Sequence, residues 1–268
     1  MLRCDQLSFA YRPGRPVLDR LTIEFAPGSL TAVLGPNAAG KSTLLRLLLG
    51  TLTASAGTVT LGGVAVRGMS PALRAGRIAY IPQAPSLAEE LSVRSVVELG
   101  RLRRGESAAS VERAMERAEL SSLGETPFAE LSAGQQQRVS LARVLAQLDA
   151  TLPPAMETVI LADEPLSAMD PRHAVRCLSC LAGEARAGRT VLVVLHDLSL
   201  AARMCDRVLL LRADGTCLAH GATGLVITDS NLSEAFQTSM RVHRDGEGGV
   251  IAVQPTLPAE PPVAAARG

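Results

Sequence analysis

The chain has 268 residues, 47% of them hydrophobic, so it can bury one large core or one core with a small appendage. A formal net charge of +1, an aromatic content of 2% and the lack of tryptophan count against nucleic-acid binding, which needs basic surface and stacking side chains. No apolar run reaches the roughly 18 to 20 residues of a membrane helix, and Arg3 and Asp5 interrupt any signal-peptide apolar segment, so we expect a cytosolic protein.

Five cysteines are scattered along the chain, an odd number that suits reduced thiols. Cys177 and Cys180 have the spacing of a CxxC pair. Because the sequence has no second pair and these two lie in a helix-like stretch, buried helical thiols are favoured over a metal site.

The first 25 residues predict an antiparallel β section. Apolar and polar residues alternate around residues 7–9 and 21–25, and a turn-rich segment lies between them. Tyr11 stands at the turn side of the first strand. Its ring could supply the flat apolar face on which an adenine stacks, although a half-buried strand aromatic explains it equally well.

A phosphate-binding loop follows. Residues 30–34 are apolar and β-branched, as in a buried strand, and residues 44–49 are helix formers that end at Gly50, a residue suited to a helix C-cap. Between them lies the sequence Gly35-Pro36-Asn37-Ala38-Ala39-Gly40-Lys41-Ser42-Thr43. Backbone N–H groups and the positive end of the helix dipole bind a phosphate in such a loop.

Two side chains of this loop add specificity. Lys41 supplies a full charge for the β- and γ-phosphates, and Ser42 offers a hydroxyl to a magnesium ion. A glycine-containing turn that binds nothing is disfavoured by the complete spacing and the strand and helix on either side. The chain is therefore predicted to bind a nucleoside triphosphate.

Residues 57–66 predict a hairpin and residues 78–81 a short strand that Pro82 ends. Gln83 follows at the strand exit, where its amide could reach a magnesium ion or a water. From Leu91 to Leu123 the apolar residues recur at helical spacing.

A second helix start suited to an anion comes after Leu131. It carries a serine and a glycine directly before a helical pattern, in the sequence Ser132-Ala133-Gly134-Gln135. One nucleotide cannot easily contact both helix starts within one compact domain. The second start therefore predicts a partner subunit.

Two carboxylates end the next strand. Residues 147–158 contain paired prolines and predict a surface loop, whereas residues 158–162 predict a buried strand that leads to Asp163 and Glu164. The carboxyl ends of strands are where open α/β sheets bind ligands. Asp163 would hold magnesium through water and Glu164 would act as general base toward the attacking water. A helix N-cap pair before Pro165 is the alternative.

A third apolar strand, residues 190–195, brings His196 to the same edge, where its imidazole N–H could contact a γ-phosphate. A purely structural histidine is the alternative. Before this strand, Asp170 could cap a helix that starts at Pro171. Residues 207–221 predict a closing hairpin.

The C-terminal region has weaker signals. Residues 231–236 predict a short helix with Asp229 or Ser230 as its cap, and residues 250–253 predict a last strand. Residues 255–268 are rich in proline and alanine without periodicity, so we expect them to be disordered.

With these motifs in order, roughly residues 1 to 225 resemble the nucleotide-binding subunit of an ABC transporter. The matches are Tyr11 for the adenine-stacking position, 35–42 for Walker A, Gln83 for the Q-loop, 131–135 for the signature, 159–164 for Walker B, 167–170 for the D-loop and His196 for the switch histidine.

The resemblance implies an α/β P-loop NTPase of ABC type, with an antiparallel β-subdomain, a mainly parallel core sheet and a helical subdomain at about 84–150 in a domain of residues 1–225. A small helix and hairpin extension at 226–254 and a disordered tail at 255–268 would follow.

The resemblance also implies an ATP-binding and ATP-hydrolysing subunit that requires Mg²⁺ and energises a transporter. Two copies would pair head to tail, so that each Walker A loop faces Ser132, Ala133, Gly134 and Gln135 of the other copy, with Asp170 close by. Further partners would be polytopic membrane permease subunits, received at residues 87–99, and a substrate-binding protein. The subunit would lie peripherally at the cytoplasmic face of the inner membrane.

Two positions depart from the family pattern. Ala133 replaces the first glycine of Leu-Ser-Gly-Gly-Gln, and Ala38 stands where Walker A usually has glycine. A methyl group is tolerated where φ is negative, whereas a positive φ would cost about 1 kcal/mol. We expect activity to survive with a somewhat altered nucleotide affinity.

The segment at 196–206 and the C-terminal tail resemble subunits that energise uptake of iron-siderophores, haem or cobalamin, and the proline-containing insertion after residues 143–147 resembles haem importers in particular. An ABC exporter subunit remains an alternative. A soluble ABC ATPase acting on ribosomes or DNA is another, but the sequence has neither the second cassette nor the long coiled coil of those proteins.

Overall fold

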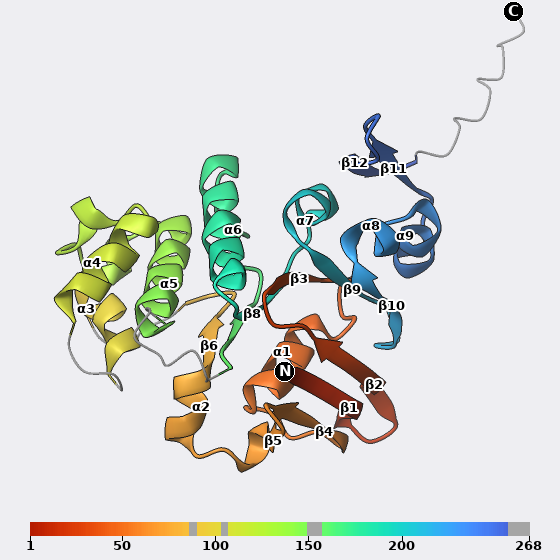
Figure 1. Cartoon of the computed structure of the whole chain (residues 1–268), viewed down its shortest axis with the longest axis horizontal. Coiled ribbons are helices and arrows are strands. Elements are labelled where there is room, and N and C mark those ends of the chain that lie inside the picture. The colour runs from red at the N-terminus through yellow and green to blue at the C-terminus, as the bar shows by residue number, and fades with distance from the viewer. Residues whose placement is uncertain (86–89, 103–106, 149–156, 257–268) are drawn as a thin grey trace, which may run out of the picture.

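The computed structural model describes residues 1–85, 90–102, 107–148 and 157–256. It has an antiparallel layer, a larger mixed sheet, a group of helices to one side and a small C-terminal extension (Figure 1). Three predicted features lie partly outside these ranges. They are the surface loop at residues 149–156, the permease-facing stretch at residues 87–89, and the tail from residue 257 onward.

The antiparallel layer confirms the predicted N-terminal β section. Strand β1 (Leu2–Arg12) pairs with β2 (Arg15–Phe25) on one side and with β4 (Ala56–Leu61) on the other, and β5 (Val64–Ala65) completes the predicted hairpin. The inward side chains of these strands share one hydrophobic core with helix α1 (Lys41–Leu49). This layer therefore supports the helix that follows the phosphate loop.

The larger sheet places the candidate site. Its strands, in spatial order, are β10 (Cys217–Ala222), β9 (Arg207–Leu211), β3 (Ser29–Leu34), β8 (Thr190–Val194), β7 (Val159–Ala162) and β6 (Ile78–Ile81). All neighbours are parallel except β10 with β9, which form the predicted closing hairpin. Strands β3, β7 and β8 are buried throughout, as parallel strands covered on both faces should be. The carboxyl ends of β3, β6, β7 and β8 therefore meet at one edge.

The helices cover this sheet and extend to one side of it (Figure 1). The helices not yet located are α2 (Pro71–Arg77), α3 (Val93–Glu98), α4 (Ala108–Arg117), α5 (Ala133–Leu148), α6 (Pro171–Arg186) and α7 (Leu198–Met204), with short 3-10 turns at Val66–Gly68, Leu99–Arg101, Ser121–Leu123 and Phe128–Glu130. Helices α3, α4 and α5 pack on one another beside α6, and their division from the core as a subdomain stays a prediction. Among the described residues, no helix is long and apolar enough to cross a membrane.

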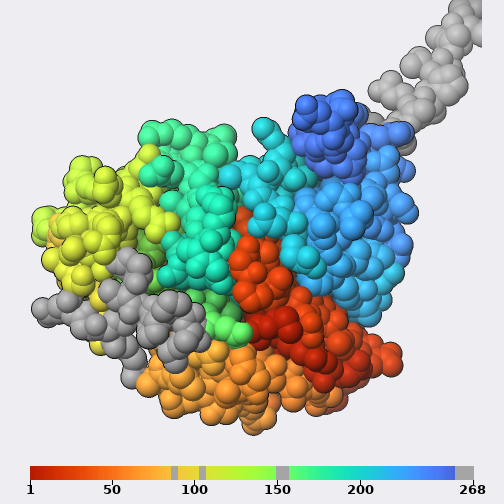
Figure 2. All heavy atoms as spheres, in the orientation of Figure 1, coloured from red at the N-terminus to blue at the C-terminus, as the bar shows by residue number. Residues whose placement is uncertain are grey.

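The C-terminal extension contains α8 (Thr223–Val226), α9 (Asp229–Phe236), β11 (Met240–Arg244) and β12 (Val250–Pro255). Strand β12 packs on α7, where the N–H of Val253 donates to Ser199 Oγ at 2.9 Å. Figure 2 shows the C-terminal strands in dark blue, beside the lighter blue residues that precede them in the chain. Because β12 runs to Pro255, the predicted tail begins inside a strand.

The predicted cap of α9 is wrong. Thr228 is the N-cap, and its hydroxyl oxygen accepts the N–H of Asn231 at 3.2 Å. Asp229 is the first helical residue instead, and its carboxylate accepts the N–H of Val242 in β11 at 2.7 Å. An extended threonine before the helix suits the cap geometry, and the aspartate is then free to anchor the hairpin.

The paired cysteines lie in the interior of α6. Cys177 and Cys180 are both free and buried, which confirms the prediction of buried helical thiols. Burial raises the pKa of both thiols, so they stay protonated at neutral pH.

Candidate nucleotide site

The phosphate loop leaves a helix N-terminus open. Helix α1 begins directly after Gly40, which is its N-cap with φ of 88°, and no side chain among the described residues caps the first turn. The first N–H groups of a helix lack intrahelical partners and carry the positive end of the dipole. An anion placed at the loop would therefore meet unpaired donors, as the sequence predicts.

Close packing explains which loop positions must be glycine. A Cβ atom on Gly35 would lie 2.7 Å from the carbonyl oxygen of Leu211. One on Gly40 would lie 2.8 Å from the carbonyl oxygen of Val17, and both glycines have positive φ. These contacts involve backbone, which cannot give way locally, so a side chain at either position would displace the loop.

The two departures from the family pattern differ in backbone conformation. Ala38 is exposed and has φ of 65°, so it carries the strain of about 1 kcal/mol that a positive φ imposes on alanine. Ala133 is the first residue of α5 and lies outside the positive-φ set, so its methyl group imposes no such strain. Only the departure in Walker A has a conformational cost.

Lys41 folds over its own loop. Its Nζ donates to the carbonyl oxygens of Gly35 at 2.8 Å and Pro36 at 2.9 Å, and the residue is 6% exposed. Burial lowers the pKa of this ammonium group, while Glu164 and Asp163 act in the opposite direction. The lysine charge therefore lies within the loop, where a bound phosphate would replace the carbonyls as its partner.

Ser42 and Asp163 form the candidate magnesium site. Ser42 Oγ donates to Asp163 Oδ1 at 2.9 Å, and Asp163 is 2% exposed, with its pKa raised mainly by burial. A hydroxyl and a carboxylate are ligands that Mg²⁺ prefers, so the donor set fits this ion. No group of three or more His, Cys, Asp or Glu that could hold a metal occurs within the described ranges. The remaining ligands would be Gln83, which the sequence predicts as a ligand, together with nucleotide oxygens and waters.

Tyr80 is a residue of this site that the sequence reasoning missed. Its hydroxyl donates to Asp163 Oδ2 at 3.4 Å from the neighbouring strand β6, and burial raises its pKa to about 12. The sequence offers a partial signal, because Tyr80 lies near the end of a strand predicted to reach the same edge, but its place opposite Leu161 appears only in the structure.

Glu164, Gln83 and His196 are brought together as predicted. Gln83 Nε2 donates to Glu164 Oε2 at 2.7 Å, and His196 Nε2 lies 2.6 Å from Glu164 Oε1. The three residues come from the ends of β7, β6 and β8, respectively. Each oxygen of the carboxylate is therefore held by one neighbour, at the edge where the phosphate loop also lies.

Tyr11 lies beside the loop. Its hydroxyl is 3.3 Å from Thr43 Oγ1, and its ring stands at 88° to that of Phe9 with centroids 4.8 Å apart. Because the residue is 56% exposed, much of the ring remains open to a stacking partner.

The signature residues lie in a different place. Ser132 and Gln135 form a capping box at the start of α5, in which the N–H of Ser132 donates to Gln135 Oε1 at 2.8 Å and the N–H of Gln135 donates to Ser132 Oγ at 3.3 Å. Together with Gly134 and Asp170 they line a pocket of about 210 Å³. None of the Walker A, Walker B, Gln83 or His196 residues lines that pocket. The predicted nucleotide residues thus form two separate groups on one chain.

Comparison with known proteins gives the same family. The chain matches the family described as ABC transporter over residues 18–167. It is 42% identical over 253 residues to the hemin import ATP-binding protein HmuV of Pseudomonas aeruginosa, covering 93% of this chain and 97% of that protein. HmuV of Rhizobium meliloti is 35% identical, with 90% of this chain and 93% of that protein covered.

Solved structures agree. An ABC transporter assigned to the metal-chelate type, in an inward-facing conformation, has a TM-score of 0.75 and 26% identity, covering 96% of this chain and 97% of that chain. A dimeric bacterial ABC transporter cassette has a TM-score of 0.70 and 26% identity, covering 83% of this chain and 99% of that chain. This chain therefore belongs to the ABC transporter family, as an ATP-binding subunit that hydrolyses ATP to drive transport.

Proposed function

We propose that this chain is the ATPase of a haem importer. The observation that carries the proposal is its 42% identity to a hemin import ATP-binding protein over 93% of this chain and 97% of that one. Iron-siderophore or cobalamin import is the second candidate, because the segment after His196 and the C-terminal hairpin resemble those subunits as well. The cargo does not touch any residue of the site, so its identity rests on similarity.

In the proposed mechanism, one copy supplies the Walker residues. Tyr11 stacks on the adenine, backbone N–H groups of the phosphate loop hold the phosphates, and Lys41 neutralises their charge. Ser42, Asp163 and Gln83 would hold Mg²⁺. When bound there, the ion offsets the charge of the phosphate oxygens.

Glu164 takes the proton of the attacking water. Its contacts to Gln83 and His196 keep both carboxylate oxygens at the sheet edge, and either contact would have to loosen for the base to face water. Because the two carboxylate neighbours come from different strands, small shifts between these strands would change the availability of the base.

The second group of residues acts on the nucleotide of another copy. Ser132, Gly134 and Gln135 present a helix start at a pocket that is lined by no residue of the chain's own phosphate loop. A head-to-tail dimer would bring this pocket to the partner's triphosphate, with Asp170 beside it. The dimer would associate with polytopic permease subunits at the cytoplasmic face of the inner membrane, and a substrate-binding protein would deliver the cargo to the permease.

Growth on defined iron sources tests the cargo. Deletion of the gene for this chain should abolish growth on hemin as the sole iron source and leave growth on ferric salts or a ferric siderophore unchanged. Complementation with the wild-type chain should restore growth on hemin, and the Glu164→Gln variant should not. Loss of growth only on the siderophore would replace haem by the second candidate, and unchanged growth on every source would contradict both.

A further inference from the structure

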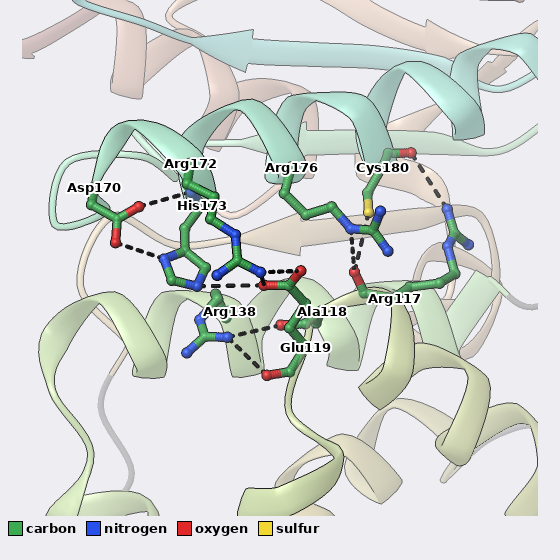
Figure 3. Close-up of polar contacts among 9 residues, drawn as sticks. All are labelled: Arg117, Ala118, Glu119, Arg138, Asp170, Arg172, His173, Arg176 and Cys180. Carbon is green, nitrogen blue, oxygen red and sulfur yellow. Dashed lines mark hydrogen bonds and ion pairs between the residues drawn. The ribbon is translucent and has the colours of Figure 1, made fainter.

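The end of helix α4 is bound by arginines from two other helices (Figure 3). Arg138 of α5 donates through Nη1 to the carbonyl oxygens of Ala118 at 3.2 Å and Glu119 at 2.8 Å. Arg176 of α6 donates through Nε to the carbonyl oxygen of Arg117 at 3.2 Å. The last carbonyls of a helix lack intrahelical partners and carry the negative end of its dipole, so cations stabilise them. These contacts join α4, α5 and α6 at one point.

Glu119 reaches from this point to the start of α6. It follows the C-cap of α4 and has φ of 57°, a conformation that glycine usually provides at the end of a helix. Its carboxylate accepts two hydrogen bonds from Arg172 Nη2, at 3.0 and 3.2 Å, and lies 3.5 Å from His173 Nε2. Glycine would adopt this turn more easily than glutamate does. What Glu119 adds is the contact of both carboxylate oxygens with α6.

His173 continues this link to Asp170. Its Nδ1 lies 2.8 Å from Asp170 Oδ2, and its backbone N–H donates to Asp170 Oδ1 at 2.9 Å (Figure 3). The side chain of His173 is 22% exposed, whereas that of Asp170 is 58% exposed. One partly buried histidine therefore binds both oxygens of an exposed aspartate, and Glu119, which follows the end of α4, lies at the far side of its ring.

The segment around Asp170 is also packed against the signature. A Cβ atom on Gly134 would lie 2.5 Å from the carbonyl oxygen of Ala168, and Gly134 lines the same pocket as Asp170 and His173. Gly134 at the start of α5 therefore lies close against Ala168, and the contacts of His173 connect Asp170 to Glu119 at the end of α4.

We propose that His173 is a positioning residue for Asp170, and that Glu119 holds His173 so that the signature and the D-loop reach the partner's nucleotide as one unit. This inference rests on the proposed head-to-tail dimer, in which that pocket faces the other copy. Neither residue touches ATP. Both act through Asp170, so their loss should slow hydrolysis by the dimer and leave ATP binding by the chain's own Walker residues unchanged.

Steady-state ATPase assays and nucleotide binding on the purified chain test this role. His173→Ala should lower kcat about two- to tenfold, the change expected when the hydrogen bond of a partly buried histidine is lost. The Kd of a fluorescent ATP analogue should stay within about twofold, because Tyr11 and Lys41 are not altered. Glu125→Ala is the matched control, since its carboxylate binds Arg94 Nε at 3.3 Å outside this network, and it should change neither quantity.

Conservative variants separate positioning from folding. The amide nitrogen of His173→Asn can occupy the place of Nδ1 and keep the contact with Asp170, but the shorter side chain cannot reach Glu119. It should recover part of the activity that His173→Ala loses and match Glu119→Ala. The double variant Glu119→Ala with His173→Ala should be no slower than His173→Ala alone, because both residues act along one path.

Three outcomes would overturn the proposal: an unchanged kcat in His173→Ala, a double variant that multiplies the two single effects, or His173→Asn as slow as His173→Ala with unaltered thermal unfolding. None of these depends on the cargo, so growth on hemin does not bear on them. A wild-type kcat that is independent of chain concentration would instead contradict the dimer of the proposed function.

Discussion

Substitution of Gly134 by alanine tests whether the signature and the D-loop are in direct contact. The added Cβ would lie 2.5 Å from the carbonyl oxygen of Ala168, well inside van der Waals contact, while the backbone of Gly134 is helical. Alanine is therefore intrinsically favoured at this position by about 0.5 to 1 kcal/mol, and the steric contact opposes it.

The steric effect should dominate. Because the obstructing atom belongs to the backbone, either the start of α5 or residues 168–170 must move, and such overpacking costs about 1 to 3 kcal/mol. For a chain of this size, 1 kcal/mol lowers Tm by about 2 to 4 °C. The steric cost alone should therefore lower Tm by about 2 to 12 °C, as followed by circular dichroism on heating. The helix-propensity gain of alanine reduces this shift. The ATPase rate should fall with it, since both displaced segments line the pocket of about 210 Å³.

Gly224→Ala is the matched control. Gly224 lies in helix α8, and a Cβ atom there would meet no atom within 4 Å. This substitution should raise the free energy of unfolding of the chain by about 0.5 to 1 kcal/mol without a change in ATPase rate. If Gly134→Ala were as stable as Gly224→Ala and fully active, the close contact between the signature and the D-loop would be refuted.

Three further substitutions test the nucleotide site. Ala133→Gly has no positive φ to relieve and should lose about 0.5 to 1 kcal/mol of helix stability, so a gain in ATPase rate beyond about tenfold would contradict a tolerated alanine. Ala38→Gly removes a strain of about 1 kcal/mol but adds a similar unfolded-state entropy, so the free energy of unfolding from urea titration should change by less than about 1 kcal/mol. Glu164→Gln should slow hydrolysis by at least about a hundredfold and accumulate an ATP-bound dimer in gel filtration, whereas a wild-type rate would show that another group is the base.

The sheet edge could be predicted from the sequence because the signals there are local. The buried strands are mainly apolar runs with a polar residue close behind, as in Asp163 directly after β7 and His196 two residues after the end of β8. In a parallel sheet all such residues must emerge on one side, so sequence order alone brings Gln83, Glu164 and His196 together. The contacts at 2.7 and 2.6 Å confirm that the three meet.

Other features depend on contacts between distant segments and left no local signal. The sign of φ at Ala38 cannot be decided from the sequence, since a loop of this composition permits either sign. The cap of α9 cannot be chosen from the sequence either, because Thr228, Asp229 and Ser230 are all good cap residues, and only the hairpin that binds Asp229 excludes that residue. Glu119 resembles any polar residue at the end of a helix until α6 is placed beside it.

Two alanines that look alike in the sequence therefore have opposite physical meanings. Ala133 starts a helix, where a methyl group is favourable, whereas the neighbouring Gly134 cannot accept one because the D-loop lies against it. Ala38 carries strain in an exposed loop, because its φ is 65°. The constraint at Gly134 comes from what packs against α5, and the constraint at Ala38 comes from backbone conformation. A substitution that is conservative in one half of the site cannot be transferred to the other.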